Sequence, residues 1–163
     1  MYALDDVLVA TDLLENSDTL VDSGSGLYAT FYKQSPRWGF KVYRHKFVRD
    51  DNYEDALRLA EAGIGPKVGR KFSCVVNRGQ YKENVYGFTM ECIDITLYDY
   101  ARKTGRYIGP WRKNQYLSKI RSKLKKSAEK IGLEFNDNHT GNIGAKLDEN
   151  YNPIKWLIID AGG

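Results

Sequence analysis

The chain of 163 residues contains only two cysteines, two histidines and four prolines. Cys74 and Cys92 lack metal-ligand spacing and lie in strand-like stretches, so we expect buried, reduced thiols and no disulfide. No apolar run approaches the roughly 20 residues that cross a bilayer, which excludes a helical membrane span. Asp5 and Asp6 stand where a secretory signal carries lysine or arginine. We therefore expect a soluble, cytoplasmic protein that does not act at a membrane.

The composition is that of a folded protein: 42% of the residues are hydrophobic, 13% aromatic and 28% charged. The length suits one domain or two small lobes that share a cleft. The net charge of +4 is unevenly distributed, with an acidic N-terminal quarter and one basic segment. That segment contains Lys113, Lys119, Arg121, Lys123, Lys125, Lys126 and Lys130. A solvated helix face is the favoured interpretation, and phosphate binding is the alternative.

The N-terminal half combines strands with helical periodicity. Apolar residues at helical spacing predict a short helix over residues 3–15. The glycine-rich turn 23–26 precedes a β-branched and aromatic run, 27–33, so a hairpin is expected. Alternating residues predict another strand within 38–47, with Lys41 in its middle.

A second helix and two more strands follow. Asp50-Asp51-Asn52 is suited to cap the start of a helix, which Gly63 and Gly65-Pro66 would end. Strands are predicted at about 67–77 and 85–92, separated by a polar loop.

The C-terminal half is predicted to be helical before it returns to β structure. Helices are expected over 96–104 and 111–131, and each is followed by a glycine. A second hairpin is expected from strands at 142–146 and 155–159. The predicted fold class is therefore α+β.

Several polar residues in this pattern are suited to phosphate chemistry. A glycine-rich hairpin lets main-chain amides approach an anion, and Lys41 supplies a positive charge that Glu54 could hold in position. Asp160 follows an apolar strand and, with the amide oxygen of Asn142, is suited to a hard divalent cation. Asp137 could accept a proton from an attacking hydroxyl. These are the groups that enzymes use for phosphoryl transfer.

Six motifs, in order, make the chain resemble the protein-kinase-like superfamily over roughly residues 20–163. "GSGLYA" resembles the glycine loop, with alanine in the third glycine's place, and "GFKVY" resembles the V-A-I-K strand. "EDALRLAEAGIGPKV" resembles the αC helix and its exit into the fourth strand, and "YGFTMECID" resembles the fifth strand and hinge. "NDNHTGN" resembles the catalytic loop D-x-x-x-x-N, and "IIDAGG" resembles D-F-G with Ala161 replacing phenylalanine.

The resemblance implies a fold and a set of roles. Residues 1–92 would form an N-lobe that contains the N-terminal helix, the glycine loop, a small antiparallel sheet and αC. Residues 93–163 would form a reduced, mostly helical C-lobe that contains the hinge, two helices, a catalytic-loop hairpin and the metal-binding aspartate. ATP would bind at Gly24, Ser25, Gly26, Lys41, Glu91, Cys92 and Ile93. Mg²⁺ would bind at Asn142 and Asp160, and the catalytic residues would be Asp137, Lys41 and Glu54.

The sequence also departs from the family pattern. Phe135 and Asn136 stand where protein kinases have histidine and arginine, which argues against control by a phosphorylated activation loop. His139, two residues after Asp137, resembles a residue in the loops of small-molecule and atypical kinases. Hydrogen bonding within the loop is nevertheless its favoured role. The sequence stops where an activation segment would begin, so the resemblance is to a minimal atypical kinase without that segment or the later C-lobe helices.

Two functions compete. The first is a minimal ATP-dependent kinase that phosphorylates a protein serine or threonine, with autophosphorylation, and whose target completes the substrate site. The second is a kinase-fold pseudo-enzyme that binds or inhibits a partner macromolecule. A small-molecule acceptor and nucleic-acid binding are less favoured. A homodimer would cover the surface left by the absent lobe, and the compact form would suit a small viral or mobile-element genome.

Overall fold

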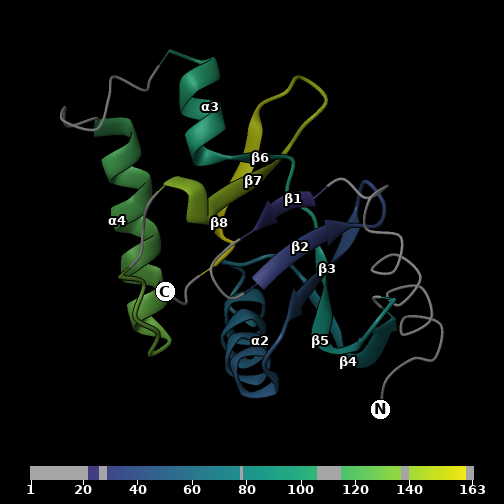
Figure 1. Cartoon of the computed structure of the whole chain (residues 1–163). Helices are drawn as coiled ribbons and strands as arrows, with labels where there is room; N and C mark the ends of the chain where they lie inside the picture. Colours follow the sequence, from purple (N-terminus) through teal and green to yellow (C-terminus); the bar gives the residue numbers. More distant parts are fainter. Residues whose placement is uncertain (1–21, 26–28, 78, 106–114, 137–139, 161–163) are drawn as a thin grey trace. The chain divides into compact units, whose positions relative to one another are not determined.

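The computed structural model describes most of the chain after the first 21 residues (Figure 1). The described residues are 22–25, 29–77, 79–105, 115–136 and 140–160. The predicted helix over 3–15 therefore lies outside them. The fold is mixed α+β.

The chain divides into two compact units, each of which is described by itself. Unit 1 takes its described residues from Met1–Glu54 and Lys67–Cys92, and unit 2 from Asp55–Pro66 and Ile93–Gly163. Helix α2, Lys46–Glu61, contributes its first part to unit 1 and its second part to unit 2.

Unit 1 is built on a five-stranded antiparallel sheet in the order β1-β2-β3-β5-β4. The strands are β1 Asp22–Ser25, β2 Ala29–Lys33, β3 Trp38–Tyr43, β4 Val68–Asn77 and β5 Lys82–Glu91. Helix α2 follows β3 and precedes β4 along the chain. The predicted strands and the first hairpin are thus confirmed, although β5 begins three residues earlier than expected.

The two faces of this sheet bury different side chains, because successive residues of a strand point to opposite faces. One face carries the cluster Phe40, Val42, Phe72, Cys74, Val76 and Val85. On the other face Phe88 packs against Tyr43 and against Tyr53 of α2, with ring centroids 6.0 and 5.2 Å apart. The first part of α2 therefore covers the second face of the sheet. The thiols of Cys74 and Cys92 are buried and not joined in a disulfide, as expected.

Helix α2 begins earlier than its sequence predicts. It starts at Lys46, so Asp50-Asp51-Asn52 lie within the helix and do not cap it, and β3 ends at Tyr43. The reason is tertiary: Arg49 in the first turn is buried against the sheet, with 1% of its surface exposed. A contact of this kind fixes a turn of helix that local propensity leaves undecided.

Unit 2 combines helices with a three-stranded antiparallel sheet in the order β6-β7-β8. The strands are β6 Ile95–Thr96, β7 Ile143–Leu147 and β8 Pro153–Ile158, and the helices are α3 Leu97–Lys103, α4 Gln115–Lys130 and the 3-10 turn η2 Thr140–Asn142. The second hairpin and both C-terminal helices are confirmed, and residues 111–114 of the second predicted helix lie outside the described residues. Gly105 and Gly132, which follow these helices, have positive φ angles of 71° and 79°, as glycine permits at a helix end.

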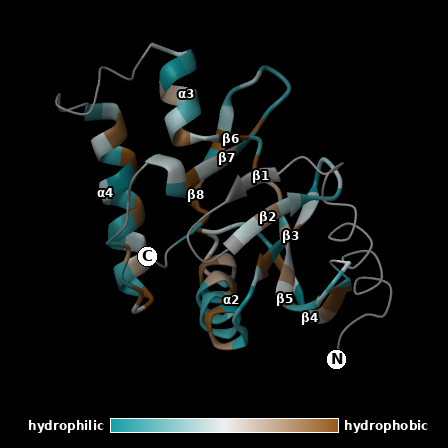
Figure 2. Cartoon of the chain, in the orientation of Figure 1, coloured by the Kyte–Doolittle hydropathy of each residue, from teal (hydrophilic) through white to brown (hydrophobic). Residues whose placement is uncertain are grey.

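The core of unit 2 lies between its helices and its sheet. It contains Leu59, Leu97, Ala101, Leu117, Leu124, Ala128, Leu133, Phe135, Ile143 and Ile158. Figure 2 shows hydrophilic and hydrophobic residues alternating along α4. Most of its lysines are exposed, which agrees with a solvated face. Of the described helices, none is long and apolar enough to span a membrane.

Gly87 in β5 permits a close approach between strands in the sheet of unit 1. A methyl group at this position would lie 2.6 Å from Cζ of Phe72 and 2.7 Å from the carbonyl oxygen of Lys41. We expect Gly87→Ala to lower the free energy of unfolding by about 1–3 kcal/mol, because the core must shift to admit the methyl group. Urea denaturation measures this change. Gly79→Asn is the control, since Gly79 has open space around it and asparagine tolerates positive φ; an equal loss in both variants would contradict the explanation.

Candidate functional site

The glycine-rich stretch lies in a β-hairpin, as the resemblance implies. Gly24 and Ser25 end β1, and Ser25 pairs with Thr30 of β2. The register shifts between Asp22 and Gly24, which marks an irregularity in the first strand. Gly26, the third expected loop residue, lies outside the described residues.

Lys41 lies in the middle of β3, half-buried, opposite Phe31 of β2 and Phe88 of β5. Its neighbours Phe40 and Val42 pack into the core on one face of the sheet. The alternation of a strand therefore places Lys41 on the other face, which α2 covers. Because β3 is paired with a strand on each side, the main chain at Lys41 is fixed, and only its side chain can move.

Glu54 lies on α2, exposed, and forms no hydrogen bond or ion pair with another residue that the structure describes. The expected ion pair with Lys41 is thus not formed. The preceding residue holds the helix to the sheet, because the hydroxyl of Tyr53 donates a 2.9 Å hydrogen bond to the carbonyl oxygen of Gly69.

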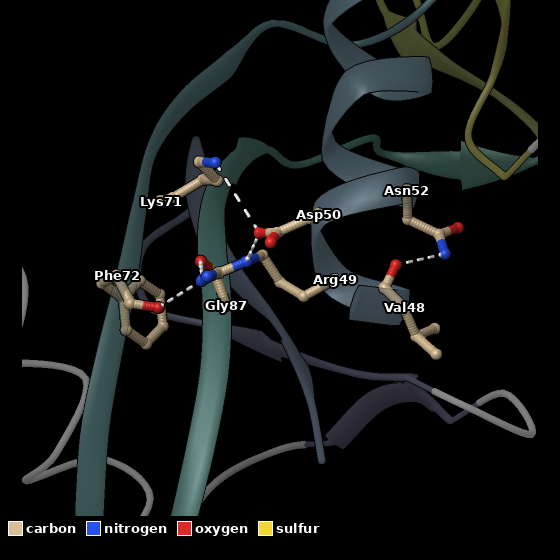
Figure 3. Close-up of polar contacts among 7 residues, drawn as sticks. All are labelled: Val48, Arg49, Asp50, Asn52, Lys71, Phe72 and Gly87. Carbon is tan, nitrogen blue, oxygen red and sulfur yellow. Dashed lines mark hydrogen bonds and ion pairs between the residues drawn. The ribbon is translucent and has the colours of Figure 1, made fainter. Parts of the chain in front are cut away.

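The strongest polar cluster of unit 1 surrounds Arg49 (Figure 3). Its Nη1 donates to the carbonyl oxygens of Phe72 at 2.7 Å and of Gly87 at 3.1 Å, and its Nε donates to Asp50 at 2.7 Å. The guanidinium also lies 5.7 Å from the ring centroid of Tyr86. These contacts compensate a charge that would be unfavourable in the interior. Sequence reasoning missed this cluster, since an arginine before two aspartates is typical of an exposed helix.

The same cluster changes the acidity of Asp50. The pKa of this carboxyl lies below its ordinary value of 3.8, mainly because Arg49 donates a hydrogen bond to it. Desolvation by burial raises the pKa, and the positive charges of Arg49, Lys71 and Lys46 lower it further. Nζ of Lys71 lies 3.6 Å from the carboxylate. The folded state therefore favours ionised Asp50.

The expected hinge begins at Glu91, the last residue of β5. The amide of Glu91 donates to the carbonyl oxygen of Lys67 at 2.8 Å, and that of Cys92 donates to the carbonyl oxygen of Arg37 at 2.7 Å. These two N–H groups are thus already used within unit 1. Of the three expected hinge residues, Ile93 is the one whose amide forms no main-chain hydrogen bond to another described residue.

Asn142 and Asp160 lie close together in unit 2. Asn142 ends η2 and precedes β7, whereas Asp160 comes two residues after the end of β8. The amide of Ile159 donates a 2.9 Å hydrogen bond to the carbonyl oxygen of Asn142, and Ile143 pairs with Ile158. Asp160 therefore follows directly on the residue bonded to Asn142. Both are partly buried.

The donor set of this pair fits a hard cation. One amide and one carboxylate supply oxygen ligands, which Mg²⁺ prefers, and phosphate and water oxygens usually complete its shell. Among the described residues, no group of three histidine, cysteine, aspartate or glutamate side chains gathers for a metal. Asp137 and His139 of the expected catalytic loop lie outside the described residues.

The comparisons with known proteins leave the family undecided. The chain matches no protein-family model, and no curated protein matches its sequence.

Stability below neutral pH tests the role of Asp50. Because the pKa of the folded-state carboxyl is lowered, its contribution is present above its ordinary pKa and is lost as the pH falls through the lower, folded value. We expect Asp50→Asn to lower the free energy of unfolding by about 1–2 kcal/mol at pH 7, and this difference to shrink below about pH 4.

The measurement is urea denaturation of both proteins from pH 7 to pH 3. Asp51→Asn is the matched control, since Asp51 is an exposed neighbour on the same helix. A difference between wild type and Asp50→Asn that stays constant down to pH 3 would show that Arg49 does not depend on this charge.

Proposed function

We propose that the chain is a minimal ATP-dependent kinase that transfers a phosphoryl group from ATP to a serine or threonine hydroxyl of a protein. The observation that carries the proposal is the pairing of Asn142 with Ile159, which brings an amide and the carboxylate of Asp160 to one end of the β7-β8 hairpin. The proposed fold is protein-kinase-like, with units 1 and 2 corresponding to its two lobes.

The order of elements in unit 1 supports this proposal. A hairpin with Gly24 and Ser25 comes first, a central strand with Lys41 follows, and α2 with Glu54 leads into β4 and β5. This is the order in which the resemblance implies the glycine loop, the lysine strand, αC and the hinge. The chain would then bind the phosphates through the hairpin amides and Lys41.

The side chains of unit 2 would carry the metal-dependent part of the reaction. Asn142 and Asp160 would hold Mg²⁺, which neutralises charge on the phosphates when bound. Asp137 would orient the acceptor hydroxyl and take its proton. The main chain at Glu91, Cys92 and Ile93 would contact adenine, chiefly through Ile93, because the other two amides already have partners.

A pseudo-enzyme that binds a partner protein is the second candidate. Two observations favour it: Glu54 has no ion-pair partner among the described residues, and two of the three expected hinge amides are used internally. Both features would weaken nucleotide binding. Its function would then depend on its surface and not on phosphoryl transfer.

Mg-ATP binding and turnover separate the two candidates. We expect Mg-ATP to raise the melting temperature of the wild-type protein, because a ligand that binds only the folded state stabilises it. We also expect transfer of label from [γ-³²P]ATP to the protein itself. Asp160→Asn and Asp137→Asn should each reduce transfer at least about 100-fold, whereas Lys41→Met should chiefly weaken nucleotide use.

Matched controls are available in both units. Lys33→Met removes an exposed strand lysine, and Glu149→Gln removes an exposed acid from the β7-β8 turn; both should retain wild-type activity. Wild-type protein that shows neither a thermal shift nor transfer would refute the kinase and leave the binding protein.

A further inference from the structure

Arg49 is the most deeply buried charged side chain of unit 1 that the structure describes, and the phosphoryl-transfer pattern assigns it no role. A charged group is retained in an interior only when its hydrogen-bonding capacity is met. Here the guanidinium donates hydrogen bonds to main-chain oxygens of the sheet and to the adjacent Asp50. The residue therefore joins α2 to the sheet.

One nitrogen of Arg49 reaches two strands at once. Phe72 of β4 and Gly87 of β5 are cross-strand partners, and Nη1 donates to both of their carbonyl oxygens. The start of α2 is thus fixed to the edge strand β4 and to its neighbour β5, which lies beside the central strand β3. Arginine suits this position, since its planar fork presents several donors in fixed directions.

The anchor point on β5 lies directly beside Lys41. Gly87 pairs with Val42 of β3, and its Cα is so close to β3 that a methyl group would contact the carbonyl oxygen of Lys41 at 2.7 Å. The connection from α2 to the lysine strand therefore runs through Arg49 and Gly87, without an intervening side chain.

We propose that Arg49 is a positioning residue of the nucleotide site, which fixes α2 to β4 and β5 and thereby sets the place of the lysine strand. This inference rests on the proposed kinase function. The buried hydrogen bonds of Arg49 would keep α2 in place without an ion pair between Lys41 and Glu54.

The test compares ATP kinetics among folded variants below their melting temperatures. Arg49→Lys keeps the charge but loses the fork, and we expect kcat/KM for ATP to fall roughly tenfold. Asp50→Asn keeps both carbonyl contacts and removes only the negative charge of the group that accepts from Nε, so a smaller fall, about threefold, is expected. Amide hydrogen exchange should also accelerate in residues 46–54 and 41–43 of Arg49→Lys, which reports the loosened contact directly.

Asn52→Ala is the matched control. Its amide donates to the carbonyl oxygen of Val48 within α2 and not to the sheet, so kcat/KM should stay within about twofold of wild type. Should Arg49→Lys fail to fold, Asp50→Asn decides the question by the same measurements. Unchanged kcat/KM in folded Arg49→Lys, or in Asp50→Asn when Arg49→Lys does not fold, would overturn the proposal. Wild type without Mg-ATP turnover would instead refute the proposed kinase function.

Discussion

The main-chain hydrogen bond between Ile159 and Asn142 is the contact on which the candidate chemistry depends. It extends the β7-β8 ladder by one pair beyond Ile143 and Ile158, both fully buried. The buried pair fixes the register, since a slip by one residue would turn the apolar side chains out of the core. The same register places Asp160 at the strand end next to Asn142. Packing in unit 2 thus brings together two residues with oxygen atoms in their side chains, Asn142 and Asp160, that are 18 positions apart in the sequence.

In unit 1, side chains of α2 hold the helix against the sheet. Tyr53 does so with its ring and hydroxyl, and Arg49 with hydrogen bonds to carbonyl oxygens of two strands. A buried arginine stabilises the native state only if its partners are in place, so the contact favours one arrangement of α2 over looser ones. Lys41 belongs to the strand beside this contact, on the face that the helix covers.

The sequence predicted the strands, the hairpins and the C-terminal helices because their periodicity is local. Lys41 in the middle of a strand and Asp160 after an apolar strand were predictable for the same reason. The start of α2 was not, since the buried contacts of Arg49 join residues that are 23 and 38 positions apart, and no short-range pattern encodes them. The internal use of the Glu91 and Cys92 amides depends on Lys67 and Arg37, which the motif alone does not reveal.

A crystal structure of the protein with Mg²⁺ and a non-hydrolysable ATP analogue tests the central claim most directly. The account predicts that oxygens of Asp160 and Asn142 bind the metal at about 2.1 Å, and that the ammonium of Lys41 contacts the phosphates of the same nucleotide. A nucleotide bound away from these residues, or a metal without either ligand, would contradict the account.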